Sequence, residues 1–471
     1  MFELKKLKVW MEATILQAER TEFLEVASDT RKDLKGKLFF ALRGENFDAH
    51  QFLEKAIEQG AAGLVIDKSE KFDEIKEKSK SITVFLVKDT LTALQSLAHE
   101  YRLALGTKII SITGSNGKTT AKEFTAQVLS VFFKTHFNSG SYNNHWGVPF
   151  SLLALKPEHE IGIIEIGMSH PHEIEKLVKI ACPQIVVCTM VGNAHIEHFG
   201  TVEKIAEAKE EIYKYSDPNG IKIFNLDNEH TYKMYVKYGF NRSQAFTFST
   251  NRKEADVFMK VNEFKIDSLT IEGSILGVKN TIQVPIFGEQ NITNIMVAAT
   301  IAIALRVQPE RVWDSLKGLS TNWGRNQFLQ SDIGGKILFD GYNANSDSMK
   351  SLLLNFSKLK TRGKKIAVLA EMLEQGDMSA ECHKNLGIQV ANSGFDIVFF
   401  YGKPWKEFKE GVDSVNKSQN IFYYPDFNNE MITKIKELET SESLICIKGS
   451  RGMKTERVVQ GLVKTFSGKY I

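Results

Sequence analysis

A glycine loop between a buried strand and a helix is the feature of this sequence that most restricts its fold. Residues 108–113 (Lys-Ile-Ile-Ser-Ile-Thr) have the apolar pattern of a buried strand and run directly into Gly114-Ser115-Asn116-Gly117-Lys118-Thr119-Thr120. Apolar residues then recur at helical spacing from Ala121 to Phe132. A strand, a glycine turn and a helix in this order are typical of an α/β domain that binds a nucleotide.

The residue types of this loop suit a triphosphate. The glycines Gly114 and Gly117 let backbone N–H groups turn toward phosphate oxygens at the start of a helix, where the helix dipole favours negative charge. Lys118 supplies a cation for the terminal phosphates, and the hydroxyl of Thr119 suits a phosphate-bound Mg²⁺. Ile112 stands where the commoner loop has glycine, so this is the shorter variant. We predict that the loop binds ATP and Mg²⁺; the alternative is an ordinary glycine turn.

Two further polar side chains follow predicted buried strands. Glu165 lies near the end of residues 161–167, and His195 follows the strand pattern of residues 185–190. Open parallel sheets bind ligands at the carboxyl ends of their strands, so we expect both side chains at the same edge as Lys118. A carboxylate and a neutral imidazole both bind divalent cations. Taken alone, Glu165 fits a helix cap or a solvent-facing carboxylate equally well, and His195 fits a structural histidine.

A zinc site is a competing interpretation of the same region. His195 and His198 lie close in sequence, and two cysteines precede them. The absence of a Cys-x-x-Cys pair and the position of Cys188 inside an apolar strand disfavour zinc. We expect all four cysteines to be reduced structural thiols: Cys182, Cys188, Cys382 and Cys446.

The length and the alternation of strand and helix patterns predict several α/β domains. The 471 residues suffice for about three domains of roughly 150 residues each. We place a first domain at residues 1–104, a central domain at 105–320 and a third at 321–471. The second boundary falls at the polar stretch 320–326, after which the strand pattern resumes at 336–340.

The composition argues against a nucleic-acid or membrane partner. The chain has 60 basic and 57 acidic side chains, so it carries little net charge with which to attract a polyanion. No apolar stretch approaches the roughly 18 residues that span a bilayer, and residues 1–10 lack the apolar core of a signal peptide. We expect a cytoplasmic enzyme.

Several short motifs, in this order and spacing, resemble the central domain of the Mur ligases. They comprise residues 114–120, 142–149, 165–167, 192–195 and 208–212. Four motifs of the C-terminal part look like the branch of this family that adds D-alanyl-D-alanine: residues 324–327, 340–349, 371–376 and 448–451. The resemblance covers essentially the whole chain, including residues 29–31 and 39–44.

The resemblance implies both a fold and an activity. The fold is a three-domain α/β architecture with a central P-loop ATPase-like domain on a parallel sheet and a C-terminal Rossmann-like domain. The activity is ATP-dependent ligation of D-alanyl-D-alanine to UDP-N-acetylmuramoyl-tripeptide through an acyl phosphate, in peptidoglycan precursor synthesis. Both substrates are small molecules, and we expect a monomer.

The resemblance also implies roles in catalysis and metal binding. Lys209 matches a lysine that becomes carbamylated in many members and supports the metal, although its charged surroundings alone favour a solvated surface lysine. The expected metal ligands are Thr119, Glu165, His195 and Lys209. The expected catalytic residues are Lys118, His195, Lys209 and Arg325.

Further residues match positions that bind the nucleotide or the substrates. Asn291 and Asn294 match the adenine side, where amides pair with a base edge, and helix capping is their alternative role. Arg325 matches a phosphate ligand and Asp340 a ribose ligand. The expected substrate-binding residues are Asp29, Thr30, Arg31, Asn143, Asn144, Tyr342, Asn343 and Asn345; a helix cap is the alternative for Asp29.

Two other functions compete with this prediction. Another Mur-type or folylpolyglutamate-type amide ligase would share the loop, but the Asp-Asn-Pro-Arg motif of the diaminopimelate-adding branch is absent. A regulatory nucleotide-binding module without ligase chemistry would be expected to lose Glu165, His195 or Lys209, and the sequence has all three.

Overall fold

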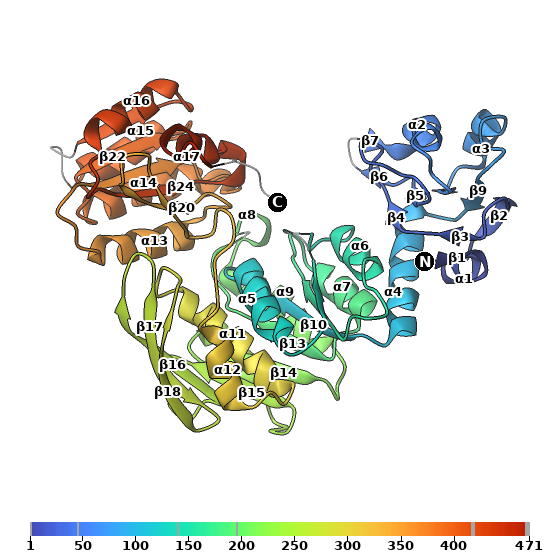
Figure 1. Ribbon diagram of the computed structural model, residues 1–471, viewed down its shortest axis with the longest axis horizontal. Helices are drawn as coiled ribbons and strands as arrows, with labels where there is room; N and C mark the ends of the chain where they lie inside the picture. The colour runs from blue at the N-terminus through green and yellow to red at the C-terminus, as the bar shows by residue number, and fades with distance from the viewer. Residues whose placement is uncertain are drawn as a thin grey trace. The chain divides into compact units, whose positions relative to one another are not determined.

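The computed structural model describes residues 2–44, 47–138, 140, 142–194, 196–415 and 420–466. Three larger sheets of these residues follow one another along the chain (Figure 1). They draw on residues 14–86, 108–284 and 327–448. The protein is an α/β protein, as predicted.

The first sheet has five strands in the order β2-β9-β8-β5-β4. β2 runs antiparallel to β9, and the other neighbours are parallel. The strands are β2 (Thr14–Gln17), β9 (Thr83–Leu86), β8 (Gly63–Ile66), β5 (Leu38–Phe40) and β4 (Val26–Ala27). Two further antiparallel pairs join β1 (Phe2–Glu3) to β3 (Glu22–Phe23) and β6 (Arg43–Gly44) to β7 (Phe47–Asp48). The helices are α1 (Leu4–Trp10), η1 (Ala49–Phe52), α2 (Leu53–Glu58), α3 (Ser69–Ile75) and α4 (Thr90–Leu105).

The second sheet has nine strands in the order β11-β12-β10-β13-β14-β15-β16-β17-β18. β11, β12 and β10 pair in parallel, as do β14, β15 and β16, whereas β16, β17 and β18 form an antiparallel meander. The strands are β10 (Lys108–Thr113), β11 (Thr135–Phe137), β12 (Ile161–Glu165), β13 (Ile185–Cys188), β14 (Ile221–Asn225), β15 (Ala245–Ser249), β16 (Val257–Phe264), β17 (Leu269–Ile275) and β18 (Val278–Val284). The sheet is therefore mixed, and the prediction of a parallel central sheet did not include the meander.

Helices lie between the parallel strands of the second sheet and after its meander. They are α5 (Lys118–Ser130), α6 (Gly147–Leu153), α7 (Glu173–Ala181), α8 (Ile196–Phe199), α9 (Val202–Lys214), α10 (Glu229–Tyr238), α11 (Asn291–Ala304) and α12 (Pro309–Leu316). α11 is buried from Ile295 to Ala304 on all sides, because it consists almost entirely of apolar residues. It packs against α5 (Figure 1), so the helix that follows the glycine loop rests on a fixed neighbour.

The third sheet has six strands in the order β19-β20-β24-β21-β22-β23. β19 (Gln327–Gln330) is antiparallel to β20 (Lys336–Asp340), and β24 (Leu444–Lys448), β21 (Lys365–Ala370), β22 (Ile397–Tyr401) and β23 (Ile421–Tyr424) continue in parallel. Its helices are α13 (Ser346–Lys358), η2 (Gly376–Met378), α14 (Ser379–Ala391), α15 (Trp405–Asp413), α16 (Asn429–Leu438), η3 (Arg451–Met453) and α17 (Glu456–Leu462). Successive residues of β20 point to opposite faces of the sheet. Leu338 packs into the hydrophobic core on one face, and Ile337 packs into the core on the other face. Helices thus cover both faces, as expected for a Rossmann-like sheet.

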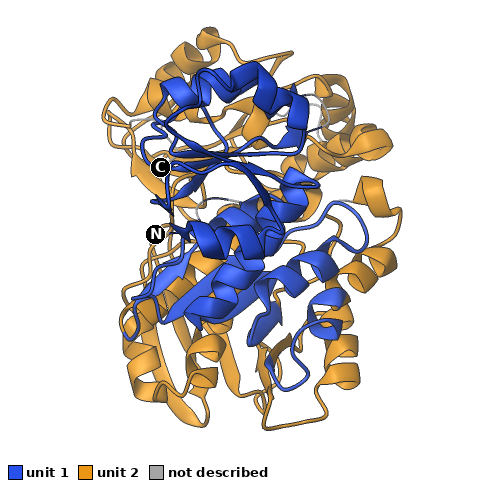
Figure 2. Ribbon diagram, turned by 90° about the vertical axis from the view of Figure 1, so that its right-hand side faces the viewer, with its two compact units in different colours: residues 1–113, 132–187, 211–221 blue, residues 114–131, 188–210, 222–471 orange. Residues whose placement is uncertain are grey.

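The chain divides into two compact units (Figure 2). One unit comprises residues 1–113, 132–187 and 211–221, and the other comprises residues 114–131, 188–210 and 222–471. The three functional domains at 1–104, 105–320 and 321–471 stay a prediction.

Two simpler expectations concern cysteines and membranes. All four cysteines are free thiols, as predicted, and Cys188 and Cys446 are buried. Within the described parts of the chain, none of the helices combines the length and the apolar character that a bilayer span requires.

Candidate functional site

The glycine loop has the predicted strand–loop–helix geometry. β10 ends at Thr113, and Gly114 and Gly117 both adopt positive φ, of 147° and 82°. A Cβ on Gly114 would lie 1.9 Å from Oγ1 of Thr189, and one on Gly117 would lie 2.4 Å from Oδ1 of Asn294. Backbone conformation and close packing therefore both require glycine at these two positions.

Side chains and backbone groups that follow β13 hold the loop in place. The N–H of Ser115 donates to the carbonyl oxygen of Met190 at 2.8 Å. Oγ of Ser115 donates to the carbonyl oxygen of Gly192 at 3.0 Å and accepts from the N–H of Gly192 at 2.9 Å. Oγ1 of Thr189 donates to the carbonyl oxygen of Asn116 at 2.6 Å. The loop is thus anchored before any ligand contact, and Thr189 is a contributor that the sequence analysis missed.

The first turn of α5 carries the residues expected to face phosphate and metal. Nζ of Lys118 donates to the carbonyl oxygen of Gly114 at 2.7 Å, so the loop itself orients this cation. Thr119 is buried and Thr120 is partly exposed. Both follow Gly117, which begins α5 in the left-handed conformation.

Lys209 is a buried residue of α9, only 1% exposed. Burial, followed by the positive charge of Lys118, lowers the pKa of its amine to about 7. The alternative of a solvated surface lysine is therefore wrong. The signal was present in the sequence, because Lys209 lies four residues after Ile205 and three before Ile212, both fully buried.

Glu165 is the last residue of β12 and is also 1% exposed. It lies opposite Ile112 in the register of β10, two residues before Gly114 in sequence. Its Oε1 accepts a hydrogen bond from Nδ2 of Asn143 at 2.7 Å, and its N–H donates to Oδ1 of Asn138 at 2.9 Å. The alternative of a solvent-facing carboxylate is wrong. Asn143, which was expected to bind substrate, therefore holds the carboxylate of Glu165 through this hydrogen bond.

His195 lies outside the described residues. Elsewhere in the chain, as far as it is described, no group of three or more histidine, cysteine and acidic side chains has a metal-binding arrangement. Cys188 lies within β13, where burial raises the pKa of its thiol to about 11. A thiol that resists ionisation is a poor zinc ligand at neutral pH.

Asn291 and Asn294 lie in the first turn of α11, and both residues are buried. Nδ2 of Asn291 donates to the carbonyl oxygen of Phe287 at 2.7 Å, and Nδ2 of Asn294 donates to Oδ1 of Asn291 at 3.0 Å. Gln290 holds the N-cap position of the helix. The pair thus forms a small amide chain that reaches Gly117 through Oδ1 of Asn294.

Four predicted residues of the C-terminal part cluster around the end of β20. Oδ1 of Asp340 accepts from the N–H of Asn326 at 3.1 Å, and its other oxygen forms an ion pair with Lys448. Nζ of Lys448 also donates to the carbonyl oxygen of Asn343 at 3.1 Å. The guanidinium of Arg325 lies 3.8 Å from the ring centroid of Tyr342. An aspartate and a stacked arginine at a strand end form an ordered polar group.

Several residues expected to bind substrate have local partners. Asp29 pairs with Arg31 at 2.9 Å and also accepts from its N–H at 3.0 Å. A hydrogen bond from the Arg31 side chain is the largest of the effects that lower the pKa of Asp29 to about 2. Thr30 is buried, and the segment forms a turn, so Asp29 caps no helix. Oδ1 of Asn144 accepts from the N–H of Gly147 at 2.9 Å, at the start of α6.

The predicted residues divide between the two compact units. The unit that contains the loop also contains Lys209, Asn291, Asn294, Arg325, Asp340, Tyr342, Asn343 and Asn345. The other unit contains Asp29, Thr30, Arg31, Asn143, Asn144 and Glu165.

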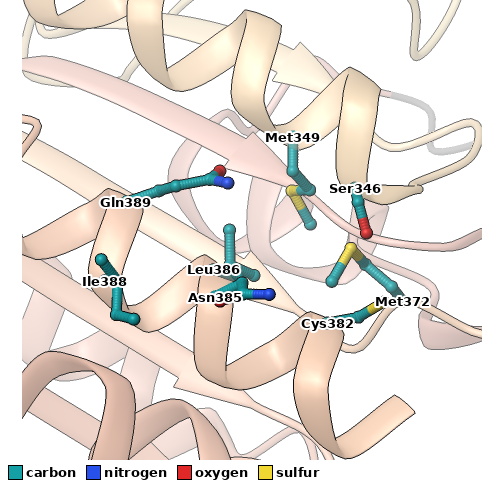
Figure 3. Close-up of a pocket in the computed structure, with 8 residues that line it drawn as sticks. All are labelled: Ser346, Met349, Met372, Cys382, Asn385, Leu386, Ile388 and Gln389. Carbon is teal, nitrogen blue, oxygen red and sulfur yellow. The ribbon is translucent and has the colours of Figure 1, made fainter. Parts of the chain in front are cut away.

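A pocket of about 230 Å³ lies between α13 and α14 (Figure 3). It is lined by Ser346, Met349, Met372, Cys382, Asn385, Leu386, Ile388 and Gln389. None of these side chains is charged and none was predicted as a site residue. The pocket is therefore unsuited to a triphosphate.

Known proteins resemble the chain over nearly its whole length. Residues 112–302 match the Mur ligase middle domain, and residues 324–451 match the domain described as Mur ligase, glutamate ligase domain. The UDP-N-acetylmuramoyl-tripeptide--D-alanyl-D-alanine ligase of Bacillus subtilis (strain 168) is 35% identical over 454 residues, 95% of each chain.

Two solved structures share the fold. MurF from Acinetobacter baumannii superposes with a TM-score of 0.87 at 27% identity, over 98% of this chain and 99% of that one. MurF ligase from Thermotoga maritima, solved in complex with ADP, gives a TM-score of 0.79 at 25% identity, over 93% of this chain and 96% of that one.

Proposed function

The chain belongs to the Mur ligase family, and from that premise we propose that it joins D-alanyl-D-alanine to UDP-N-acetylmuramoyl-tripeptide at the expense of ATP. This reaction forms a C–N bond in peptidoglycan precursor synthesis. The observation that carries the proposal is the glycine loop, in which Gly114 and Gly117 sit where any side chain would collide. The same loop orients Lys118 through its own carbonyl oxygen.

The residues around the loop fit ATP. A turn with two glycines at a helix N-terminus presents backbone N–H groups to phosphate oxygens, and Lys118 supplies the charge. We assign Asn294, which adjoins Gly117, to the base of the nucleotide, because an amide can both donate and accept hydrogen bonds at a base edge. Arg325 and Asp340 would meet the phosphates and the ribose. We assign Ser115, Asn116, Thr119 and Thr120 to the same nucleotide.

The donor set also fits Mg²⁺. Thr119 offers a hydroxyl oxygen, and Lys209 offers a buried amine that is half neutral near pH 7. A neutral amine that adds CO₂ and releases one proton becomes a carbamate, which would be a buried anion suited to a hard cation. Glu165 and His195 keep the metal-binding roles that the family resemblance implies. When bound, the cation would offset the negative charge of the phosphates.

The proposed chemistry has two steps. The tripeptide carboxylate attacks the γ-phosphate of ATP, the bond to the β-phosphate oxygen breaks, and an acyl phosphate and ADP form. The amine of D-alanyl-D-alanine then attacks the acyl carbon, phosphate leaves, and the amine loses a proton. Both partners of the first step are anions, so Lys118 and Arg325 must offset their repulsion. Fixed positive groups that need no reorganisation are the main source of rate in such a step.

The proposal extends to partners and location. We propose that the protein acts on two small molecules in the cytoplasm as a monomer, without a nucleic-acid or membrane partner. The balance of 60 basic and 57 acidic side chains supports the absence of a polyanionic partner.

A panel of amines tests the activity and its alternatives. The purified protein is incubated with ATP, Mg²⁺ and UDP-N-acetylmuramoyl-tripeptide, and the products are identified by mass spectrometry. We expect a product that has gained D-alanyl-D-alanine and no product with L-glutamate or a single amino acid. A glutamate adduct would favour a folylpolyglutamate-type ligase, and ADP release without any acceptor would favour a nucleotide-binding module. Parallel reactions with lysine and diaminopimelate tripeptides identify the third residue of the acceptor.

A further inference from the structure

We infer that the first turn of α13 is a positioning element for the glycine loop, acting through Asn345 and Asp347. The inference rests on the proposed function, because it assigns the loop to ATP. It goes further in naming two residues outside the loop that set its shape. Asn345 was expected to bind substrate, whereas Asp347 lies in the motif at 340–349 but was assigned no role.

Asn345 connects the helix to the loop directly. Its Oδ1 accepts from the N–H of Ser348 at 2.9 Å, which caps α13, and the hydroxyl of Ser348 accepts from the N–H of Asn345 at 3.0 Å. Its Nδ2 donates to Oδ1 of Asn116 at 2.9 Å. The side chain therefore uses its acceptor for the helix and its donor for the loop. Asn116 is held from the other side by Thr189.

Asp347 connects the helix to the loop through one intermediate segment. Its Oδ2 accepts from the N–H of Asn193 at 3.2 Å, and its Oδ1 accepts from Nδ2 of Asn193 at 3.4 Å. The preceding residue, Gly192, exchanges two hydrogen bonds with the hydroxyl of Ser115. A Cβ on Gly192 would lie 2.9 Å from Oδ2 of Asp347, so the carboxylate lies closely against this backbone.

The two connections end on consecutive loop residues, Ser115 and Asn116. Both start from one rigid, capped turn of helix, so the two loop residues are fixed relative to each other. A loop whose N–H groups are already oriented loses less conformational freedom when it binds phosphate. Loss of either connection should therefore weaken nucleotide binding and leave binding of the dipeptide unchanged.

Selective variants separate positioning of the loop from capping of the helix. Asn345→Ser keeps a good N-cap residue but is too short to reach Asn116. Ser348→Ala weakens the same cap and leaves both connections to the loop in place, so it is the matched control. Asp347→Ala removes the second connection, and Asp347→Asn keeps an acceptor for the N–H of Asn193. Lys350→Ala, at an exposed position of α13, controls for substitution in this helix.

The experiment measures the Kd of ATP–Mg²⁺ by calorimetry, together with KM for ATP, KM for D-alanyl-D-alanine, kcat and Tm. We expect Asn345→Ser and Asp347→Ala each to raise the Kd of ATP about fivefold, the effect of one hydrogen bond. The Kd of ATP for Asp347→Asn should be closer to the wild-type value. KM for the dipeptide should not change, and Ser348→Ala and Lys350→Ala should bind ATP as wild type does.

Folded Asn345→Ser and Asp347→Ala proteins with wild-type Kd for ATP would overturn the positioning role and leave the proposed function intact. If Asn345→Ser does not fold, the comparison of Asp347→Ala with Asp347→Asn decides the question. A wild-type protein that does not bind ATP would instead refute the proposed function, and the inference with it.

Discussion

The ammonium group of Lys118 lies 2.7 Å from the carbonyl oxygen of Gly114, at the other end of the same loop. The cation assigned to the phosphates is thus oriented by the backbone of the segment assigned to bind them. The amine of Lys209 is buried in the same compact unit, and the charge of Lys118 helps to lower its pKa. Lys118 therefore interacts both with the glycine loop and with the amine of Lys209, and the proposed chemistry depends on both.

Substitution of Lys118 tests the loop as a catalytic element. We expect Lys118→Ala to lower ADP release by at least roughly 10²–10³-fold, because one fixed donor to the transition state is worth that much. The fold should persist, because the hydrogen bonds that anchor the loop through Ser115 and Asn116 do not involve this side chain. Steady-state assays and thermal unfolding measure the two effects. Lys108→Ala, at an exposed position of β10, is the control. Near-normal ADP release by folded Lys118→Ala would remove the loop from the mechanism.

Substitution of Gly114 tests the packing of the loop. Its Cβ would lie 1.9 Å from Oγ1 of Thr189, so Gly114→Ala should destabilise the protein by about 1–3 kcal/mol or displace the loop. Gly106→Ala is the matched control, because Gly106 also has positive φ, at 69°, but has open space around it. Chemical denaturation and ATP binding measure both effects. Equal stability of the two variants would show that the contact with Thr189 is unimportant.

The pKa of Lys209 predicts a dependence of activity on pH and CO₂. A pKa lowered to about 7 means that the amine is mostly neutral above pH 7 and mostly protonated below it. CO₂ adds only to the neutral amine, so stimulation by bicarbonate should increase from pH 6 to pH 8. The measurement is ADP release in CO₂-depleted buffer with and without added bicarbonate. Lys209→Met should be inactive and unresponsive; equal activity with and without bicarbonate at pH 8 would argue against carbamylation.

The stacked pair of Arg325 and Tyr342 predicts a difference between two conservative changes. Lysine keeps the charge of Arg325 but cannot stack a planar group 3.8 Å above the ring. We expect Arg325→Lys to raise KM for ATP about tenfold, whereas Tyr342→Phe, which keeps the ring, should change it less than twofold. Wild-type kinetics for Arg325→Lys would show that the planar stacking is dispensable.

The local pattern of the sequence predicted the elements that position the site. The strands at Lys108–Thr113 and Lys336–Asp340 have the predicted bounds, because apolar spacing is a property of neighbouring residues. The meander of β16 to β18 was missed, because β18 is largely exposed and has little apolar periodicity to detect.

Contacts between distant segments could not be predicted in the same way. Asp347 and Asn193 are 154 positions apart, and no local pattern indicates that they pair. The burial of Lys209 was misjudged from its charged neighbours in sequence, although its helical spacing to Ile205 and Ile212 places it on the buried face. Charge in the immediate sequence is a weaker guide to burial than periodicity.

Transfer of an oxygen isotope tests the central claim, that the glycine loop supports ATP-driven activation of a carboxylate. UDP-N-acetylmuramoyl-tripeptide labelled with ¹⁸O in its terminal carboxylate is converted with ATP and D-alanyl-D-alanine, and the released phosphate is analysed by mass spectrometry. The account predicts one ¹⁸O atom in the phosphate for each amide bond formed, and no labelled phosphate with Lys118→Ala. Unlabelled phosphate released alongside the amide product would contradict an acyl-phosphate intermediate.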